Sequence, residues 1–167
     1  MNNALVGCYN IRYDIKPNFY NYLYRSLDIT AREASTLWEI VTSNGNIALP
    51  EKGSLEALAG KSYSFSIQCA EVVDQKKGLL QSVDEKVLSA MSVFFYTEAA
   101  SKAHSRASNN SHSRAQIESL RRMSYVAHIM AIDRNYHDSN DRAESAWNAG
   151  NEARNLYRVT GASHYAD

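Results

Sequence analysis

The chain has 167 residues and a formal net charge of zero, with 18 basic and 18 acidic side chains. Hydrophobic residues make up 44% and charged residues 22%, the balance of a globular domain that can bury a sizeable core. Neither sign of charge gathers in one segment, so the sequence shows no basic or acidic tail for nucleic acid or membrane. No run of about 18 apolar residues occurs, so no membrane-spanning helix is expected.

The cellular compartment of the protein is inferred by elimination. The first seven residues carry neither a basic flank nor a long apolar run, so a signal peptide is not expected. Two cysteines, Cys8 and Cys69, are too few for a disulfide framework, and we expect them to be thiols in a reducing compartment. The sequence therefore predicts a cytoplasmic protein without membrane contact.

The amino-terminal segment is rich in tyrosine. In residues 1–17, apolar or tyrosine side chains alternate with polar ones, which is typical of a short strand or an irregular segment, and Pro17 is expected to end it. Residues 18–27 are predicted to form a short helix with an aromatic face. Such a face suits either a cap on the helical core or a partner surface, because tyrosine is enriched at protein interfaces. The candidate partner surface consists of Tyr13, Tyr20 and Tyr24.

Three further helices are expected before the centre of the chain. Thr30 and Glu33 form a capping box that starts the first. Ser54 and Gly60 bracket a second, five-residue helix. The third and longest covers residues 62–77. These elements predict a compact helical front unit over the first half of the chain.

The order of helix, short helix, tight turn and longer helix over residues 28–80 resembles winged helix-turn-helix DNA-binding domains. The resemblance rests on residues 29–33 (Ile-Thr-Ala-Arg-Glu), the short helix 55–59 and the closing Lys-Gly-Leu-Leu of residues 77–80. It implies that the helix over 62–77 enters the major groove with its early residues facing the bases. The implied base-facing residues are Ser62, Tyr63, Ser64, Ser66 and Gln68, and the implied phosphate contacts are Lys61, Lys76 and Lys77.

Two features depart from that family. Glu71 and Asp74 lie on the expected recognition helix, where they would oppose phosphate charge. The wing that gives this family its name is missing, because Ser82 is expected to start the next helix directly after residues 77–80. The alternative is a helical subdomain that packs against the rest of the protein and reads no DNA.

The second half of the chain predicts a long antiparallel helical hairpin. Ser82 and Glu85 form a capping box for a helix over 82–107. A second helix is expected over 113–135, and its part from 123 to 132 is apolar almost all round, as in a buried central helix. A short turn makes two long helices antiparallel neighbours. The side chains expected to be buried here are Met91, Phe94, Leu120 and Ile129.

A last helix is expected over residues 141–159, with Asp141 as its cap and Gly161 as its stop. Together the predicted elements form one all-α domain, residues 1–167, with about six helices around the hairpin. Self-association through the exposed helix faces stays open, so a homo-oligomer is one expected state.

Metal binding is not favoured by the sequence. Oxygen-bearing side chains occupy positions one, three, nine and twelve of an EF-hand-like loop from Asp133 to Glu144, but position six is Asp138 where the sharp turn requires glycine. The five histidines do not form a zinc ligand set. We therefore expect a polar interhelical turn, with no metal and no cofactor.

No catalytic motif is present in the sequence. Glu39, Glu98 and Glu118 lie on helices that can converge, but no nucleophile or acid–base set can be assembled, so an enzyme is not the favoured interpretation. Two others stay open. One is a small DNA-binding regulatory or packaging-type protein that holds duplex DNA through residues 28–80. The alternative is a protein-interaction module, such as an inhibitor or adaptor, that uses the tyrosine-rich surface and binds no nucleic acid.

Overall fold

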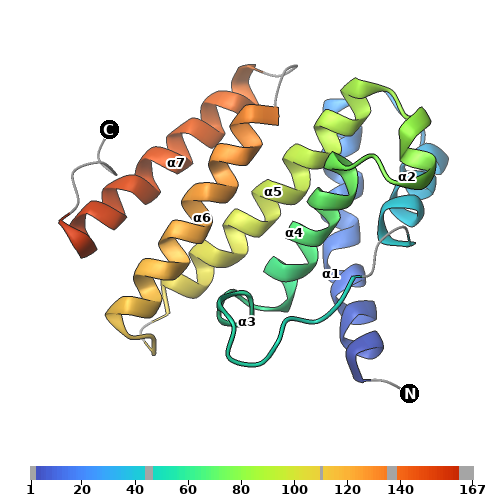
Figure 1. Ribbon diagram of the computed structural model, residues 1–167. Helices are drawn as coiled ribbons and strands as arrows, with labels where there is room; N and C mark the ends of the chain where they lie inside the picture. Colours follow the sequence, from blue (N-terminus) through green and yellow to red (C-terminus); the bar gives the residue numbers. More distant parts are fainter. Residues whose placement is uncertain (1–2, 44–46, 110, 135–138, 162–167) are drawn as a thin grey trace.

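The computed structural model describes residues 3–43, 47–109, 111–134 and 139–161, with backbone alone for residues 3–10, Tyr13 and Ser139 (Figure 1). Within these residues the fold is all-α, as predicted, with seven α-helices, one 3-10 helix and no strand. None of the described helices combines the length and apolar character that crossing a membrane requires. The elements are α1 Asn3–Ser26, α2 Ala31–Ser43, α3 Leu55–Ala59, α4 Lys61–Asp74, η1 Gly78–Ser82, α5 Glu85–Ala107, α6 Arg114–Arg134 and α7 Ser139–Thr160.

Four helices, α4 to α7, lie side by side in one row, and each runs antiparallel to the next (Figure 1). The most extensive contacts join α5 to α6, α6 to α7, and α4 to α5. At one end of the row, α1 packs on α2, α4 and α5, while α7 forms the opposite edge. The predicted antiparallel hairpin is therefore confirmed as α5 and α6, with α7 as a third antiparallel neighbour.

The central helix is α5, and not the second helix of the hairpin as the sequence suggested. Every residue of α5 from Leu88 to Tyr96 is buried, because α1, α4 and α6 cover its different sides. On α6, Val126 is 50% and Ile129 40% exposed, so the prediction that Ile129 is buried is wrong. The other expected core residues are confirmed: Met91, Phe94 and Leu120 are at most 3% exposed.

Two kinds of packing hold α5. Its first half meets α1, α2 and α4 in an aromatic cluster, in which the Phe19 ring lies 5.1 Å from Trp38 and 5.5 Å from both Phe94 and Phe95 (centroid distances). Its second half presents small, buried side chains, Ala99, Ala100, Ala103 and Ala107, which let neighbouring helices approach closely. The bulk of the core therefore lies at the α1 end of the row.

The expectation of a strand or irregular segment before Pro17 is wrong, because α1 is a helix from Asn3 to Ser26 with Pro17 inside it. Its buried side chains, Ile11, Ile15, Phe19 and Leu23, recur at every fourth residue and are at most 6% exposed. A proline inside a helix removes one backbone hydrogen bond and crowds the preceding turn. Burial of this apolar stripe against α2, α4 and α5 offsets that cost. Ile11 and Ile15 are four residues apart, and that spacing fits the alternation of a strand as well as one face of a helix. This ambiguity explains the wrong prediction.

Helix caps were predicted with mixed success. Thr30 Oγ1 and Ser54 Oγ accept the backbone N–H of Glu33 and Ala57, both at 3.1 Å, as expected. The start of α5 was placed wrongly. Ser82 is the last residue of η1, and Asp84 is the true cap, accepting the Lys86 N–H at 2.8 Å.

At the carboxyl end, α7 begins before the expected cap, so Asp141 lies in its first turn. Gly161 follows the helix with a φ of +71°, the left-handed conformation that favours glycine at a helix end, as predicted.

Candidate functional site

The helix expected to read DNA bases, α4, is built into the core. Tyr63 is 8%, Ser64 6% and Ser66 0% exposed, and Ser62 is half-buried. Gln68 is engaged in a backbone contact. Its amide nitrogen donates to the Ala48 carbonyl at 2.8 Å, and its amide oxygen accepts the Ala48 N–H at 3.0 Å. This side chain therefore ties the segment before α3 to α4, and base contact by the buried residues would require α4 to leave the core.

The lysines expected to meet phosphate are exposed but do not form one patch. Lys61 begins α4, whereas Lys76 and Lys77 follow its other end. The 14 residues of α4 separate them by about 20 Å at 1.5 Å per residue. Lys76 is also paired with the Glu85 carboxylate. DNA binding through this unit stays a prediction, and it depends on lysines at the two opposite ends of α4.

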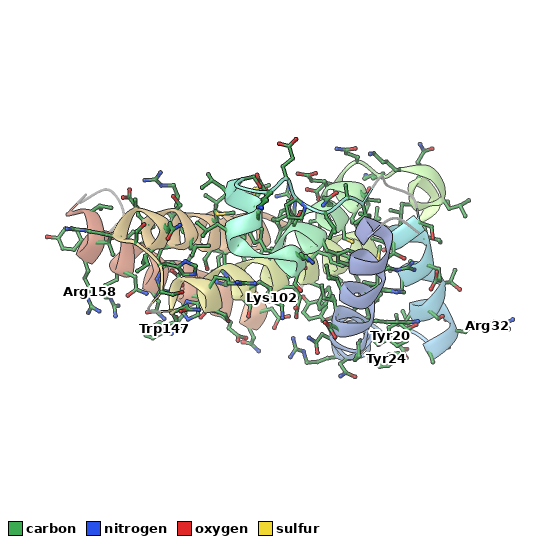
Figure 2. The ribbon with its side chains drawn as sticks, turned by 90° about the horizontal axis from the view of Figure 1, so that it is seen from below. Tyr20, Tyr24, Arg32, Lys102, Trp147 and Arg158 are labelled. Carbon is green, nitrogen blue, oxygen red and sulfur yellow. The ribbon has the colours of Figure 1, made fainter. Side chains whose placement is uncertain are left out.

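Two tyrosines of α1, Tyr20 and Tyr24, reach the surface. Tyr24 is 42% exposed, Tyr20 is half-buried, and their ring centroids are 6.2 Å apart. Lys16, one turn earlier, places its ammonium 5.7 Å from the Tyr20 ring centroid. The side chain of Tyr13 lies outside the described residues. We call Lys16, Tyr20 and Tyr24 the tyrosine face, and Figure 2 shows both rings projecting from the same outer side of α1.

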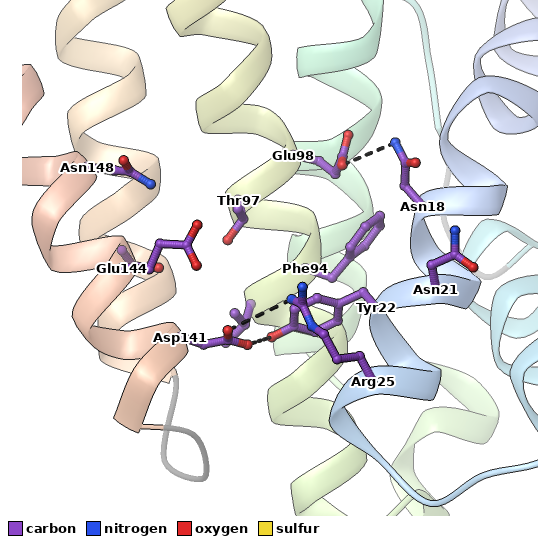
Figure 3. A pocket seen from close by; sticks show the side chains of 12 residues that line it. Asn18, Asn21, Tyr22, Arg25, Phe94, Thr97, Glu98, Asp141, Glu144 and Asn148 are labelled. Carbon is purple, nitrogen blue, oxygen red and sulfur yellow. Dashed lines mark hydrogen bonds and ion pairs between the residues drawn. The ribbon is translucent and has the colours of Figure 1, made fainter.

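A cavity of about 390 Å³ lies between α1, α5 and α7 (Figure 3). Val93, Phe94 and the Tyr22 ring supply its apolar surface, and amide, hydroxyl and charged side chains supply the rest. The polar residues lining it are Asn18, Asn21, Arg25, Thr97, Glu98, Asp141, Glu144, Ser145 and Asn148. Sequence reasoning missed this site because its walls come from three segments that are distant along the chain.

Asp141 joins α7 to α1 at one side of the cavity. The Tyr22 hydroxyl donates to its Oδ2 at 3.3 Å, and Arg25 Nη2 lies 3.8 Å from its Oδ1. The guanidinium of Arg25 also lies 5.3 Å from the Tyr22 ring centroid. Burial, and then the Asp141 charge, raises the pKa of the Tyr22 hydroxyl, so this phenol stays protonated as a donor.

Glu98 lies on the opposite side, at the α5 wall, where Asn18 Nδ2 donates to its Oε1 at a long 3.5 Å. Removal from water raises the pKa of the Glu98 carboxyl, and Lys102, one turn further along α5, together with Asn18 partly counteracts that effect. The other two glutamates on helices that could converge do not line this cavity: Glu39 is paired with Arg12 at 3.2 Å and Glu118 with Arg122 at 2.7 Å.

The part of the chain that the structure describes contains no group of three or more His, Cys, Asp or Glu side chains placed to hold a metal ion. Four positions of the EF-hand-like loop, 135–138, lie outside that part. Asp141, which the spacing assigned to this loop, contacts Tyr22 and Arg25 of α1. Cys69 is a buried thiol.

No protein-family model matches the sequence, and neither a curated protein nor a solved structure matches it. The candidate functional features are therefore surfaces of the chain itself, the tyrosine face and the cavity between α1, α5 and α7.

Proposed function

We propose that this protein is a non-enzymatic protein-interaction module that binds its partner through the tyrosine face of α1. The observation that carries the proposal is the pair of Tyr20, which is half-buried, and Tyr24, which is 42% exposed, with ring centroids 6.2 Å apart on the outer side of the helix. Tyrosine offers a large contact area and a hydroxyl for hydrogen bonding at low cost in conformational entropy.

The tyrosine face is held rigidly from beneath. Phe19, its neighbour in the chain, is fully buried and stacks on Phe95. Ile15 and Leu23 anchor the turns on either side of it. A rigid surface loses little entropy on association, so more of the contact energy appears as affinity. One cation, Lys16, borders the Tyr20 ring, and it favours a partner with an acidic group at the rim of the contact.

The alternative, DNA binding through α4, has weaker support. Its base-facing residues Tyr63, Ser64 and Ser66 are buried, and its lysines are dispersed. Titration of a random-sequence duplex at about 50 and 200 mM salt tests it directly, since phosphate contacts lose affinity steeply with salt. A salt-dependent affinity that is lost on replacing Lys76 and Lys77 by alanine would favour DNA over a protein partner.

The interaction proposal is tested by quantitative affinity capture from cells that express the protein. The bait variants are Tyr20→Ser with Tyr24→Ser and, as a control, Tyr157→Ser, which removes a ring of similar exposure (45%) from α7. We expect one partner to be retained by the wild type and the control and lost with the double variant. Equal retention by all three baits would show that the tyrosine face is not the contact.

A further inference from the structure

The cavity between α1, α5 and α7 has an excess of negative charge. Three carboxylates line it, Glu98, Asp141 and Glu144, and one cation, Arg25, so the lining carries a net charge of minus two. Arg25 lies 3.8 Å from Asp141 and balances its charge. The two glutamates, Glu98 on the α5 wall and Glu144 on the α7 wall, account for the remaining negative charge of the lining. The field inside the cavity therefore attracts cations and repels anions.

Glu98 interacts electrostatically with Lys102, one turn along α5, but its carboxylate is not fully hydrogen-bonded. It is partly withdrawn from water, and among the described residues its carboxylate accepts one hydrogen bond, the 3.5 Å contact from Asn18. A desolvated charge with one long hydrogen bond gains from a charged donor, because ionic hydrogen bonds are about twice as strong as neutral ones. The raised pKa of the Glu98 carboxyl reports the same desolvation.

The remainder of the lining suits an organic cation better than a bare ion. Phe94 and Val93 provide apolar contacts for methylene groups. The amides of Asn21 and Asn148 can fix its orientation. A volume of about 390 Å³ falls at the lower end of small-molecule sites, whose pockets combine apolar walls with a few polar groups.

We propose that this cavity binds an organic cation, an alkylammonium or alkylguanidinium group, with its charge at Glu98 and Glu144 and its carbon chain over Phe94. Figure 3 shows Glu98 on α5, Glu144 on α7 and Phe94 together in the lining. The charged group belongs either to a small molecule or to the side chain of a lysine or arginine. This inference goes beyond the proposed function, since it does not require the tyrosine face to bind anything.

The test is a calorimetric titration of the full chain with agmatine, which carries both kinds of charged end, and with 1,5-pentanediol as the neutral comparison. We expect agmatine to bind and the diol not to bind. Glu98→Gln should weaken agmatine binding at least about tenfold, the effect of losing one charged hydrogen bond. Glu51→Gln, at an exposed position away from the cavity, removes the same charge and should leave the affinity unchanged.

Two further measurements keep the test decisive. Glu144→Gln, at an exposed position of α7, replaces Glu98→Gln should that variant fail to fold, and it should also weaken binding. A capped Gly-Arg-Gly peptide that binds more tightly than agmatine identifies a protein side chain as the source of the cation, and the reverse identifies a small molecule. No binding of either probe, or equal binding by wild type and both cavity variants, would overturn the proposal.

Discussion

Arg134, at the end of α6, holds the carboxylate of Asp74, at the end of α4, with Nη2 2.8 Å from Oδ2 and Nε 2.9 Å from both carboxylate oxygens. The hydroxyls of Ser92 and Tyr96 on α5 donate to the same carboxylate. Burial alone would raise the pKa of Asp74, but the hydrogen bonds from Arg134, Ser92 and Tyr96 lower it below its ordinary value. One carboxylate thus joins three helices. The Asp74 charge is therefore balanced by Arg134, which weakens its repulsion of a phosphate.

Replacing Arg134 by methionine should lower the free energy of unfolding by about 1–3 kcal/mol, since it leaves a partly buried carboxylate with two hydroxyl donors. Urea denaturation measures the loss. The control is Arg122→Met, which breaks the more exposed pair with Glu118 and should cost less than about 1 kcal/mol. A double-mutant cycle with Asp74→Asn should show clear coupling. Additive losses would mean that the two side chains stabilise the fold independently.

The aromatic cluster should be the most sensitive part of the core. Phe94 is 3% exposed, and its ring lies 5.1 Å from that of Phe95, centroid to centroid. Phe94→Ala should cost about 3–5 kcal/mol, because it removes a buried ring and leaves a cavity. Ile129→Ala, on the exposed side of α6, should cost less than about 1 kcal/mol. Similar losses for the two variants in urea denaturation would place the core elsewhere.

Helix ends were predictable where short-range chemistry decides them. Ser54 caps α3 through a hydroxyl that reaches only three residues along the chain. The continuation of α1 through Pro17 was not predictable from local rules, since they favour a break at proline. Packing of Phe19 against Trp38 and Phe95, both distant in the chain, overrides that preference.

Orientation and assembly were harder to predict than helix position. The helix-turn-helix resemblance implied that Ser64 and Ser66 face DNA bases, yet both are buried where small side chains let the neighbouring helix approach. The cavity combines Asn18, Glu98 and Glu144 from three helices, and no local spacing relates them. Such a site follows from tertiary packing alone.

Ser66 offers a test of the assigned role of α4. Its side chain is fully buried, and its hydroxyl has no hydrogen-bond partner among the described residues. A buried hydroxyl without a partner costs about 1–3 kcal/mol in desolvation. Ser66→Ala should therefore leave the urea midpoint unchanged or raise it. A clear drop would show that the hydroxyl bonds to a partner such as water, and a change in affinity for duplex DNA would restore α4 as a base-reading helix.

His128 lies on the inner side of α6 and is 6% exposed. Its Nδ1 has no hydrogen-bond partner among the described residues. Burial first, and then the electrostatic effect of His104, lower the pKa of the His128 imidazole to about 4. His104 of α5 makes polar contacts with Glu152 of α7 and Arg121 of α6, and Arg121 is also paired with Glu152. His128 is therefore neutral in the folded protein at neutral pH.

This burial predicts a loss of stability on mild acidification. An unfolded histidine binds its proton at a pKa of about 6.5, well above the folded value, so between these values the unfolded state holds more protons. The free energy of unfolding should fall by about 3 kcal/mol as the pH drops from above 6.5 to about 4. The raised pKa of Glu98 acts in the opposite direction near the acidic end of this range. Urea denaturation at several pH values should show the fall in the wild type and a flatter profile in His128→Leu. Parallel profiles for the two proteins would mean that other groups cause the acid sensitivity.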